Sequence, residues 1–358
     1  MNLKKLSILM VLSGLLFTSC SDDDDNSPDL PLGAYDNGLL ILNQGNFGGG
    51  NSSISYWSSD FTDFQLNAYG TVNPNTPLGD TGQDIGFYQD KAFVVMNYSE
   101  TIQVINRYTL VPIATISTGL KNPRYIAFVN GKGYVTNWGN PTDATDDYVA
   151  VIDLSNYAVT ASISVAEGPE RLVEENGKLY VAHLGGYGYG NTVSVINAVN
   201  NSVSGTIAVG DVPNSMFIEN NTLYVLGGGK AAWTGNETRG SLTKINLANN
   251  TIIGTFEFSE GEHPSNLVKE EGKMYYTLDA AIYGTSITTT SLPSSPLFST
   301  NSQGVYGVYS FAVEEDKIYV GDALDFNSNG KIYVYSLTGT LLKEQTVGVI
   351  PAGFYFND

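Results

Sequence analysis

Hydrophobic positions in this chain fall in short runs separated by turn residues. Between residues 122 and 165 there are four such runs, each about five residues long and rich in β-branched or aromatic side chains: 125–129, 133–137, 149–154 and 159–165. Gly, Asn, Asp or Pro bounds each run, which is typical of strands. The pair Asn130-Gly131 favours a two-residue hairpin, because both residues accept a positive φ. This stretch therefore predicts four antiparallel strands.

The same unit recurs along the chain. A proline or an equivalent residue opens each copy, at positions 82, 123, 169, 213, 264, 308 and 351. A four-stranded unit that repeats every 41 to 51 residues or so is typical of a propeller blade or of another repeat array. No segment after residue 36 has helical periodicity, so we expect an all-β fold.

The two ends of the repeat array predict that it closes into a ring. The last copy, 351–358, is a first strand that stops at its turn, whereas the first copy, 37–43, begins at a second strand. Joined, they complete one blade, and pairing of the C-terminal strand with the N-terminal hairpin removes exposed sheet edges. We therefore predict a seven-bladed β-propeller of four-stranded blades over residues 36–358.

The first residues have the pattern of a targeting segment. Residues 1–19 contain Lys4-Lys5 and a mainly apolar run from 6 to 17, which is too short to span a bilayer. Cys20 follows small residues and is the chain's only cysteine, so no disulfide is expected. This arrangement resembles the lipobox of bacterial lipoproteins, in which the cysteine is lipidated and becomes the mature N-terminus. An ordinary secretory signal with an incidental cysteine is the alternative.

An acidic run comes directly after this cysteine. Asp22–Asp25 must be solvated, because four adjacent carboxylates cannot pack together, and residues 20–35 are interpreted as a flexible tether. The run resembles the signal that sends lipoproteins of Bacteroidetes-type bacteria to the outside of the outer membrane. The resemblance implies a lipid-anchored outer-membrane protein that faces the cell exterior; retention in the periplasm is the alternative.

Composition narrows the range of partners. The chain has 17 basic and 36 acidic residues and a formal net charge of −19. Such a field repels nucleic acid and anionic glycans, so we expect no nucleic-acid partner. We expect contact with a membrane through the lipid anchor alone.

In a propeller of this topology, one face of the disk gathers candidate binding residues. The residues that follow the repeat openings surround the mouth of the central channel: Gln83, Arg124, Glu170, Asn214, Ser265, Tyr309 and Ala352. The second strands end at the same face, at Asn43, Asn97, Asn137, His183, Gly227, Leu278 and Asp322. The loops after them carry aromatic side chains among Gly, Asn and Ser: Phe47, Tyr98, Trp138, Tyr187, Tyr189, Trp233, Tyr283 and Phe326. Binding usually resides on such loop-rich faces.

This collection of side chains suits a wide, flat, amphipathic small molecule. Rings supply apolar area at low entropic cost, and amide groups satisfy a polar edge. We expect Asn43, Gln44, Gln83 and Asn137 to bond polar substituents, with His183 beside them, and Arg124 to meet a carbonyl or phosphate oxygen. The alternative is that each ring packs under its own loop.

The sequence signals for a metal site or for catalysis are weaker than those for ligand binding. Asp325, Asn327 and Asn329 match the first half of a calcium loop, but Ser336 stands where a bidentate Glu is expected, so a simple turn is the alternative. Asp143, Asp146 and Asp147 form another acidic loop that could hold a cation or be solvated. Neither histidine has a second His or a Cys at the spacing of zinc ligands. No nucleophile elbow or paired His and carboxylate is visible, so we expect a non-enzymatic protein that requires no cofactor.

Two sets of motifs carry a resemblance to known propellers. Gly131–Asn137, Val149–Asp153 and Gly205–Gly210 are similar to YVTN, or YncE-like, propeller repeats, over nearly the whole mature chain. More narrowly, Gly38–Gly48 and Pro77–Gln83 resemble surface lipoproteins of gut Bacteroidetes, a group that includes the BtuG-type propellers. Those proteins capture vitamin B12 and pass it to a TonB-dependent, BtuB-like outer-membrane transporter.

This resemblance implies capture of a bulky nutrient, with cobalamin or another corrinoid first. Binding of a siderophore, haem or glycan, or a protein adhesion or assembly role, are the alternatives.

Overall fold

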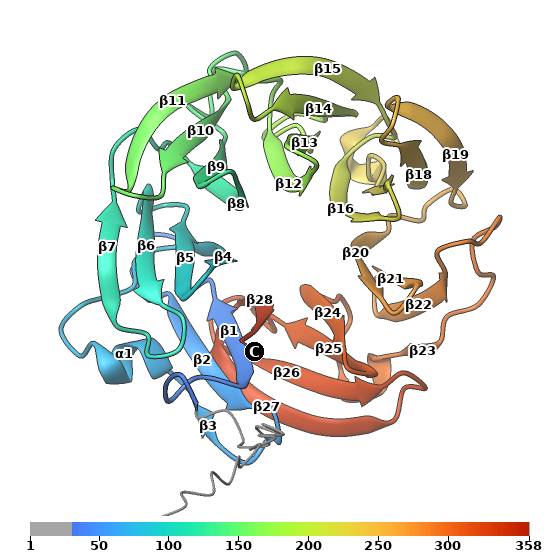
Figure 1. Cartoon of the computed structure of the whole chain (residues 1–358). Coiled ribbons are helices and arrows are strands. Elements are labelled where there is room, and N and C mark those ends of the chain that lie inside the picture. The colour runs from blue at the N-terminus through green and yellow to red at the C-terminus, as the bar shows by residue number, and fades with distance from the viewer. Residues whose placement is uncertain (1–30, 358) are drawn as a thin grey trace, which may run out of the picture. The chain divides into compact units, whose positions relative to one another are not determined.

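The computed structural model describes residues 31–357, and within them the chain forms seven four-stranded antiparallel sheets arranged in a ring (Figure 1). Blade 1 contains β1 (Gly38–Asn43), β2 (Ser53–Ser58), β3 (Phe64–Gln65) and β28 (Pro351–Phe356). Blade 2 contains β4 (Gly82–Tyr88), β5 (Lys91–Met96), β6 (Thr101–Asn106) and β7 (Pro112–Ile116). Blade 3 contains β8 (Pro123–Val129), β9 (Lys132–Asn137), β10 (Tyr148–Asp153) and β11 (Ala158–Ser164).

The other blades follow in chain order. Blade 4 contains β12 (Pro169–Glu175), β13 (Lys178–His183), β14 (Thr192–Asn197) and β15 (Ser202–Ala208). Blade 5 contains β16 (Pro213–Glu219), β17 (Thr222–Gly227), β18 (Ser241–Asn246) and β19 (Thr251–Glu257). Blade 6 contains β20 (Ser265–Glu270), β21 (Lys273–Leu278), β22 (Ala281–Ser286) and β23 (Phe298–Ser299). Blade 7 contains β24 (Ser310–Glu314), β25 (Lys317–Asp322), β26 (Asn329–Ser336) and β27 (Leu341–Val349).

The ring closes as the sequence predicts. β28 pairs antiparallel with β1, with Ile41 opposite Phe354, so the end of the chain supplies the innermost strand of blade 1. Backbone bonds continue the closure beyond the strands, from Asn37 N–H to the Asn357 carbonyl at 2.9 Å and from Asn357 N–H to the Gly38 carbonyl at 2.8 Å. The predicted seven-bladed propeller and its mode of closure are confirmed.

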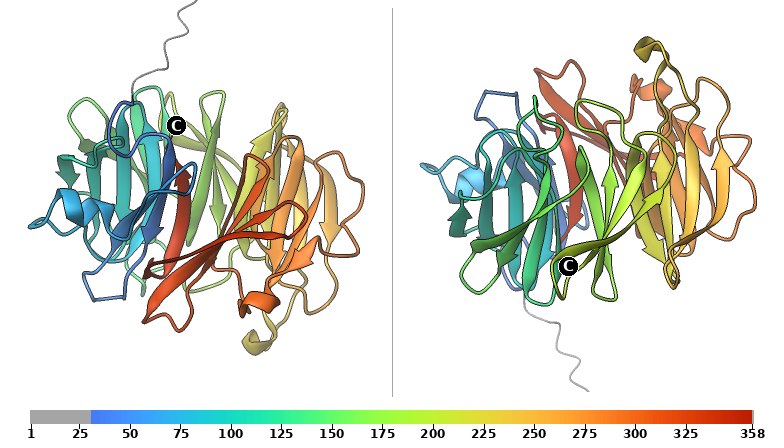
Figure 2. Two further views of the ribbon diagram at one scale, coloured as in Figure 1. Left: turned by 90° about the horizontal axis from the view of Figure 1, so that it is seen from below. Right: turned by 90° about the horizontal axis from the view of Figure 1, so that it is seen from above.

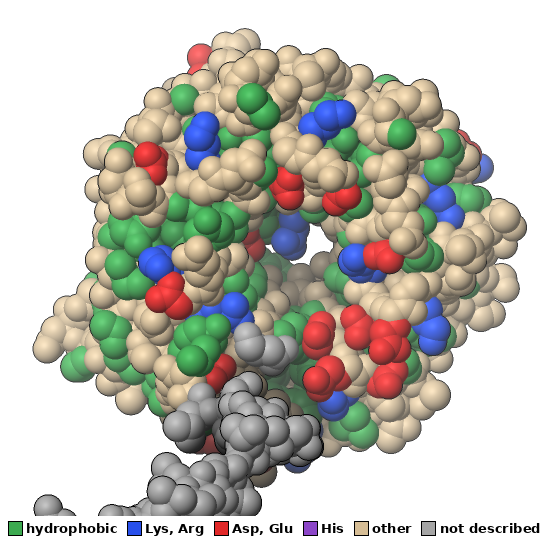
Figure 3. Space-filling model, in the orientation of Figure 1, with side chains coloured by type: hydrophobic (Ala, Val, Ile, Leu, Met, Phe, Trp, Pro, Cys, Tyr) green, Lys and Arg blue, Asp and Glu red, His purple; other side chains and the backbone are tan. Residues whose placement is uncertain are grey.

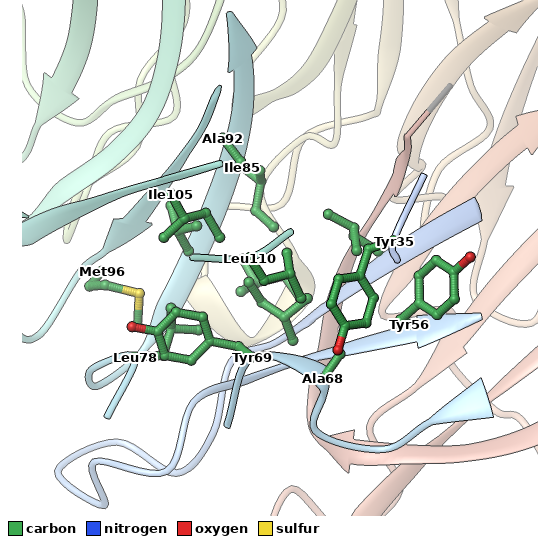
Figure 4. Close-up of a cluster of buried hydrophobic side chains, with 14 residues drawn as sticks. Tyr35, Tyr56, Ala68, Tyr69, Leu78, Ile85, Ala92, Met96, Ile105 and Leu110 are labelled. Carbon is green, nitrogen blue, oxygen red and sulfur yellow. The ribbon is translucent and has the colours of Figure 1, made fainter. Parts of the chain in front are cut away.

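Apolar side chains from neighbouring blades form the core between the sheets. Between blades 1 and 2, buried residues of β1, β2, β4, β5 and β6 pack together, and Tyr35 joins them from the segment before β1 (Figure 4). α1 (Ala68–Val72) adds Ala68 and Tyr69 to this cluster, and Asn67 caps it by accepting the Gly70 N–H at 2.9 Å. Sequence periodicity did not predict α1, because five residues are too few to show a helical repeat. Two 3₁₀ turns, η1 (Ala232–Thr234) and η2 (Asn301–Gln303), lie in loops.

The inner strands carry a bulge near their first residue. In β12, Pro169 lies opposite His183 and Leu172 opposite Val181, so both Glu170 and Arg171 lie against a single residue of β13. The same kind of register shift occurs near the start of β4, β8, β16, β20 and β28 in the described chain. A bulge places two consecutive residues against one partner and bends the strand. In blade 3 the bulge brings two neighbouring side chains, Arg124 and Tyr125, to the central channel, and in blade 4 it brings Arg171 there.

The two faces of the disk differ. The connections β1–β2, β9–β10, β13–β14 and β17–β18 all lie on one face, here called the rim face, and the long β17–β18 connection with η1 projects from it (Figures 1 and 2). Leu32–Asn37 lie on the opposite face, where Tyr35 N–H donates to the Tyr108 carbonyl at 3.0 Å in the β6–β7 loop. The chain therefore enters the propeller from the face away from the rim.

The predicted signal segment (1–19), Cys20 and the acidic run lie outside the described residues. None of the helices in the described part of the chain has the length and apolar character needed to cross a bilayer.

Candidate functional site

A cavity of about 710 Å³ occupies the rim side of the central channel. Aromatic rings from five blades line it, together with amide side chains; among them are Phe47, Trp138, Tyr187 and Tyr309, with Gln44, Gln83 and Asn214. The channel opening at the centre of the ring is visible from the opposite face in Figure 3. Of the residues predicted to surround the mouth, Gln83, Arg124, Asn214, Ser265, Tyr309 and Ala352 line this cavity.

One wall of the cavity is an aromatic pair supplied by two adjacent blades. Trp138 follows β9, and its indole N–H donates to the Pro169 carbonyl at 3.0 Å, which fixes the ring. Tyr187, in the β13–β14 loop, meets it edge to face with the ring centroids 5.9 Å apart. Tyr187 is 70% exposed, so its ring is available to a ligand at little cost of reorganisation.

Arg124 supports this wall through an ion pair and a ring contact. Its Nε and Nη2 donate to the two carboxylate oxygens of Glu170 at 2.9 and 2.8 Å, and its guanidinium carbon lies 4.1 Å from the centre of the Trp138 ring. Attraction to Glu170 outweighs burial and raises the pKa of Arg124, although burial alone lowers it. A bidentate pair of this kind uses two of the five N–H donors of the guanidinium group. Arg124 therefore holds the Trp138 ring in place, and because it also lines the cavity, its expected contact with a carbonyl or phosphate oxygen stays a prediction.

The opposite wall is a chain of rings and amides from blades 7, 1 and 2. Phe47 packs on Tyr98 with ring centroids 4.3 Å apart, and only Phe47 of the two reaches the cavity. The Tyr309 hydroxyl donates to Gln44 Oε1 at 2.7 Å, and Phe326 meets the Tyr309 ring edge to face. Gln44 and Phe47 thus face the cavity, as predicted from the sequence.

Three predicted polar contacts do not reach the cavity. The Asn43 amide donates to the hydroxyls of Ser53 and Ser55 at 3.1 and 2.9 Å, and its side chain is fully buried. Asn137 is likewise buried, donating to the Val135 carbonyl and accepting from Lys121 N–H.

His183 lies 2.8 Å from Ser194 Oγ and is 1% exposed, and burial lowers the pKa of His183 to about 4. Strand alternation explains all three, since the last residue of each second strand points into the sheet packing.

Three predicted rings lie away from the cavity. Tyr283 is part of β22, not of a loop, and stacks on Tyr276 with centroids 5.1 Å apart. Tyr189 lies near Lys230, whose Nζ is 5.8 Å from the ring centre. Trp233 lies in η1 of the projecting insertion and is 83% exposed. All three rings are absent from the cavity lining.

The acidic sequence that resembles half a calcium loop forms a hydrogen-bonded turn. Asp325 Oδ1 accepts from the N–H groups of Asn327 and Ser328 at 3.0 and 2.7 Å, and Oδ2 accepts from the Ser328 hydroxyl at 2.9 Å. Asn327 Oδ1 accepts from Asn46, and Asn329 begins β26. No group of three or more His, Cys, Asp or Glu side chains in the described part of the chain is arranged to hold a metal.

A second acidic loop fixes the position of the Tyr187 loop through Gly168. Asp147 is 3% exposed, and its Oδ2 accepts the Gly168 N–H at 2.5 Å. The Gly168 carbonyl in turn accepts from Leu184 N–H at 2.9 Å. Burial, aided by the nearby carboxylates of Asp146 and Glu167, raises the pKa of Asp147 to about 6. The carboxylate therefore acts on the ligand face indirectly, through the backbone that carries Tyr187.

Several residues of the cavity lining were not predicted from the sequence, and two of them lie in a bulge beside a residue that was. Tyr125 and Arg171 each follow a residue that was identified, and both line the cavity because the bulge turns a second side chain toward the channel. A sequence signal exists in hindsight: both are large residues two positions after a blade-opening proline. The guanidinium carbon of Arg171 lies 4.0 Å from the centre of the Tyr125 ring.

A further groove of about 690 Å³ runs beside blade 5. It is lined by small, apolar and charged residues, among them Gly210, Thr238, Arg239 and Glu257, and none of the residues in its lining is aromatic. It lacks the rings that a flat amphipathic ligand needs, so the channel cavity is the better candidate.

Comparison with known proteins identifies one family and several solved structures with a similar fold. The sequence profile of a domain of unknown function (DUF5074) matches residues 37–356. No curated protein sequence matches the chain.

Among solved structures, a quinonprotein alcohol dehydrogenase-like protein from Bacteroides thetaiotaomicron is 14% identical, with a TM-score of 0.68 over 90% of this chain and 79% of that one. A functionally unknown protein from Desulfotomaculum acetoxidans is 13% identical, with a TM-score of 0.65 over 89% and 98%. BamB from Moraxella catarrhalis is 10% identical, with a TM-score of 0.52 over 88% and 85%. At these identities the likeness concerns the fold alone.

Proposed function

The chain belongs to the DUF5074 family, and we propose that this member is a non-catalytic capture protein for a bulky, flat nutrient that binds on the rim face. The observation that carries the proposal is the cavity of about 710 Å³ in which rings and amides from different blades converge. Its volume lies within the range of roughly 300–1,000 Å³ that is typical of small-molecule sites. A larger ligand would seat one part in the cavity and rest on the exposed rings around it.

Cobalamin or another corrinoid is our first candidate ligand. Its support is the sequence resemblance of Gly38–Gly48 and Pro77–Gln83 to BtuG-type propellers, together with the fit of a broad ring system to the wall made by Trp138 and Tyr187. Siderophores, haem and glycans are the other ligands that this chemistry would accept.

We further propose that the protein is lipid-anchored at Cys20 on the outer membrane and delivers its ligand to a TonB-dependent transporter. Leu32–Asn37 lie on the face away from the rim. A tether that continues from these residues would leave the rim face turned away from the anchoring membrane, which suits capture from the exterior.

Calorimetry with cobalamin and cobinamide tests the ligand, with haem, a ferric siderophore and oligosaccharides as comparators. We expect Tyr187→Ala to weaken binding about tenfold, which corresponds to about 1.4 kcal/mol of lost ring contact. Trp233→Ala is the matched control, since Trp233 is more exposed than Tyr187 but lies outside the cavity, and it should leave the affinity unchanged. No heat with either corrinoid would refute the choice of ligand, and equal losses in the two variants would refute the choice of site.

A protein-docking role has one observation in its favour. Trp233 and Tyr306 are 83% and 81% exposed on the rim face, in the connections β17–β18 and β23–β24, and large exposed rings are enriched at protein interfaces. Co-purification of a transporter that depends on Trp233 and Tyr306, from a protein that binds none of the small molecules, would favour docking over capture. Dependence on these rings together with ligand binding would fit delivery to a transporter.

A further inference from the structure

Arg171 presents an uncompensated guanidinium group to the channel. It lies in the bulge of β12, and its side chain is exposed to the channel lumen. The other basic residues of the cavity lining are paired: Arg124 with Glu170, and Lys269 with Glu219. Among the described residues, none forms a hydrogen bond or an ion pair with Arg171, whose contact is the ring of Tyr125 at 4.0 Å.

The geometry of this contact leaves the hydrogen-bond donors of Arg171 available. A guanidinium that stacks on a ring uses its face, while its N–H groups lie in its plane and point outward. A planar fork of N–H donors matches a carboxylate or a phosphate, either of which it can hold by two parallel bonds. Arg171 is therefore held in place by an aromatic ring while its bonding capacity stays unused.

The nearest carboxylate does not neutralise this charge by direct contact. Asp84 is buried next to the channel, and its two oxygens accept from Ile126 N–H at 3.1 Å and from the Tyr355 hydroxyl at 3.2 Å. Burial raises the pKa of Asp84, although the Arg171 guanidinium opposes that shift. The Arg124–Glu170 pair is internally balanced. Arg171 is thus the basic residue of the cavity lining that has no carboxylate in direct contact within the described part of the chain.

Tyr125, on whose ring Arg171 stacks, supplies a second hydrogen-bond donor. The Tyr125 hydroxyl accepts from Gln83 Nε2 at 2.9 Å, and no acceptor for its own proton is found in the described part of the chain. Burial raises the pKa of Tyr125, so the phenol keeps that proton. An oxygen that enters the channel beside Arg171 would find a phenol O–H as well as the guanidinium.

We propose that the channel contains an oxyanion subsite at Arg171, which takes a carboxylate or phosphate group of the captured ligand while the rest of that ligand lies on the aromatic rim. The assignment of the group to a larger ligand rests on the proposed function, but the subsite itself does not. Such a subsite would fix how deep and in which orientation the ligand sits, since one charged end must reach the channel before the rings close on the remainder.

Binding of small anions to the full mature chain tests the subsite without the nutrient. Inorganic phosphate and sodium acetate are titrated separately, at constant ionic strength with chloride, and binding is measured by calorimetry and by the shift in Tm. We expect millimolar binding of at least one anion, weakened tenfold or more in Arg171→Gln. Stronger binding of phosphate than of acetate would assign the group as a phosphate, and the reverse would assign a carboxylate.

Arg239→Gln is the matched control, because Arg239 is also on the rim face but is exposed and lies outside the cavity. It should leave anion binding unchanged. Arg171→Lys, which keeps the charge without the fork, should retain part of the affinity, and it replaces Arg171→Gln if the neutral variant does not fold.

Absence of binding of both anions, or equal binding in wild type and the Arg171 variants, would overturn the subsite. The outcome separates it from the proposed function. Corrinoid binding without any Arg171-dependent binding of phosphate or acetate would leave capture standing and the subsite refuted. Anion binding that depends on Arg171, without any corrinoid binding, would do the reverse.

Discussion

Replacing Asp147 with asparagine should stabilise the protein at alkaline pH and not at acidic pH. Asp147 is buried with its Oδ2 on the Gly168 N–H, and burial together with neighbouring carboxylates raises the pKa of Asp147 to about 6. The folded protein therefore holds this proton more tightly than the unfolded chain, in which an aspartate has a pKa of about 3.9. Ionisation in the folded state costs stability, and an asparagine oxygen could accept the same N–H without any charge.

The size and sign of the effect follow from linkage between proton binding and folding. Below pH 3.9 both states are protonated and the charge has no effect. Between about pH 4 and 6 the unfolded chain loses the proton first, so the stability of the wild type falls. Above pH 6 the loss is constant at about 2 units of pKa times 1.36 kcal/mol, or about 3 kcal/mol at most. Asp147→Asn should recover that amount at pH 8, which is about 4 °C in Tm for a chain of this size.

His183 makes the comparison with a variant necessary. Burial lowers the pKa of His183 to about 4, so its contribution is present above pH 6.5 and is lost as the pH falls toward 4. This opposes the trend from Asp147 over the same range, so the two contributions offset each other in the wild-type curve. Both proteins contain His183, so its contribution to the free energy of unfolding cancels in the difference between wild type and Asp147→Asn.

Thermal unfolding at pH 4, 6 and 8, followed by near-ultraviolet circular dichroism, measures this difference. Asp60→Asn is the control, since Asp60 is exposed in the β2–β3 connection and its carboxylate accepts from the Ser58 hydroxyl and from Thr62. It should not raise Tm at any pH. A gain for Asp147→Asn that is equally large at pH 4, or no gain at pH 8, would show that the buried carboxylate is not ionised at a cost.

Three further outcomes follow from the structure. Glu170→Gln should destabilise the protein by about 3 kcal/mol in urea titrations, because it leaves the half-buried Arg124 without its bidentate partner; Glu344→Gln, in an exposed pair, should cost less than 1 kcal/mol. Gly168→Ala should displace the Tyr187 loop and weaken ligand binding in calorimetry, since a Cβ there would lie 1.8 Å from the Gly186 nitrogen and φ is +62°; full affinity would refute the link. Deleting residues 351–358 should abolish the cooperative thermal transition by removing β28 from blade 1, whereas a soluble, cooperative protein would contradict ring closure as the source of stability.

The fold could be predicted from the sequence because each blade repeats its own turn signals. Positions 82, 123, 169, 213 and 351, read as blade openings, are the first residues of β4, β8, β12, β16 and β28. Asn130 and Gly131 have φ values of 52° and 71°, as the predicted hairpin requires. Turn sequences of this kind act locally, whatever the rest of the fold is. Their repetition in every blade strengthens the prediction of a repeat fold.

The site could be predicted only by face and not by residue. Asn137 and His183 were assigned to the open face because each ends a second strand, but both side chains point into the sheet packing. On the inner strands, Arg124 was identified directly after its proline, whereas Arg171, two positions after its proline, is the unpaired basic residue of the cavity. The reason for this second miss is the bulge, which adds one residue and changes which side chains face the channel beyond it. A bulge depends on how the strand pairs with the next one, and no single residue type predicts that pairing.

The pairing of β28 with β1 also sets the order in which the molecule can be completed. Strand β1 is among the first ordered segments to leave the ribosome, yet its inner neighbour is among the last. Blade 1 must therefore wait, one strand short, while six other sheets form, and its open edge is exposed to wrong partners throughout synthesis. Late release of the C-terminal strand, more than the strength of any single sheet, should control how much of the newly made chain reaches the native ring.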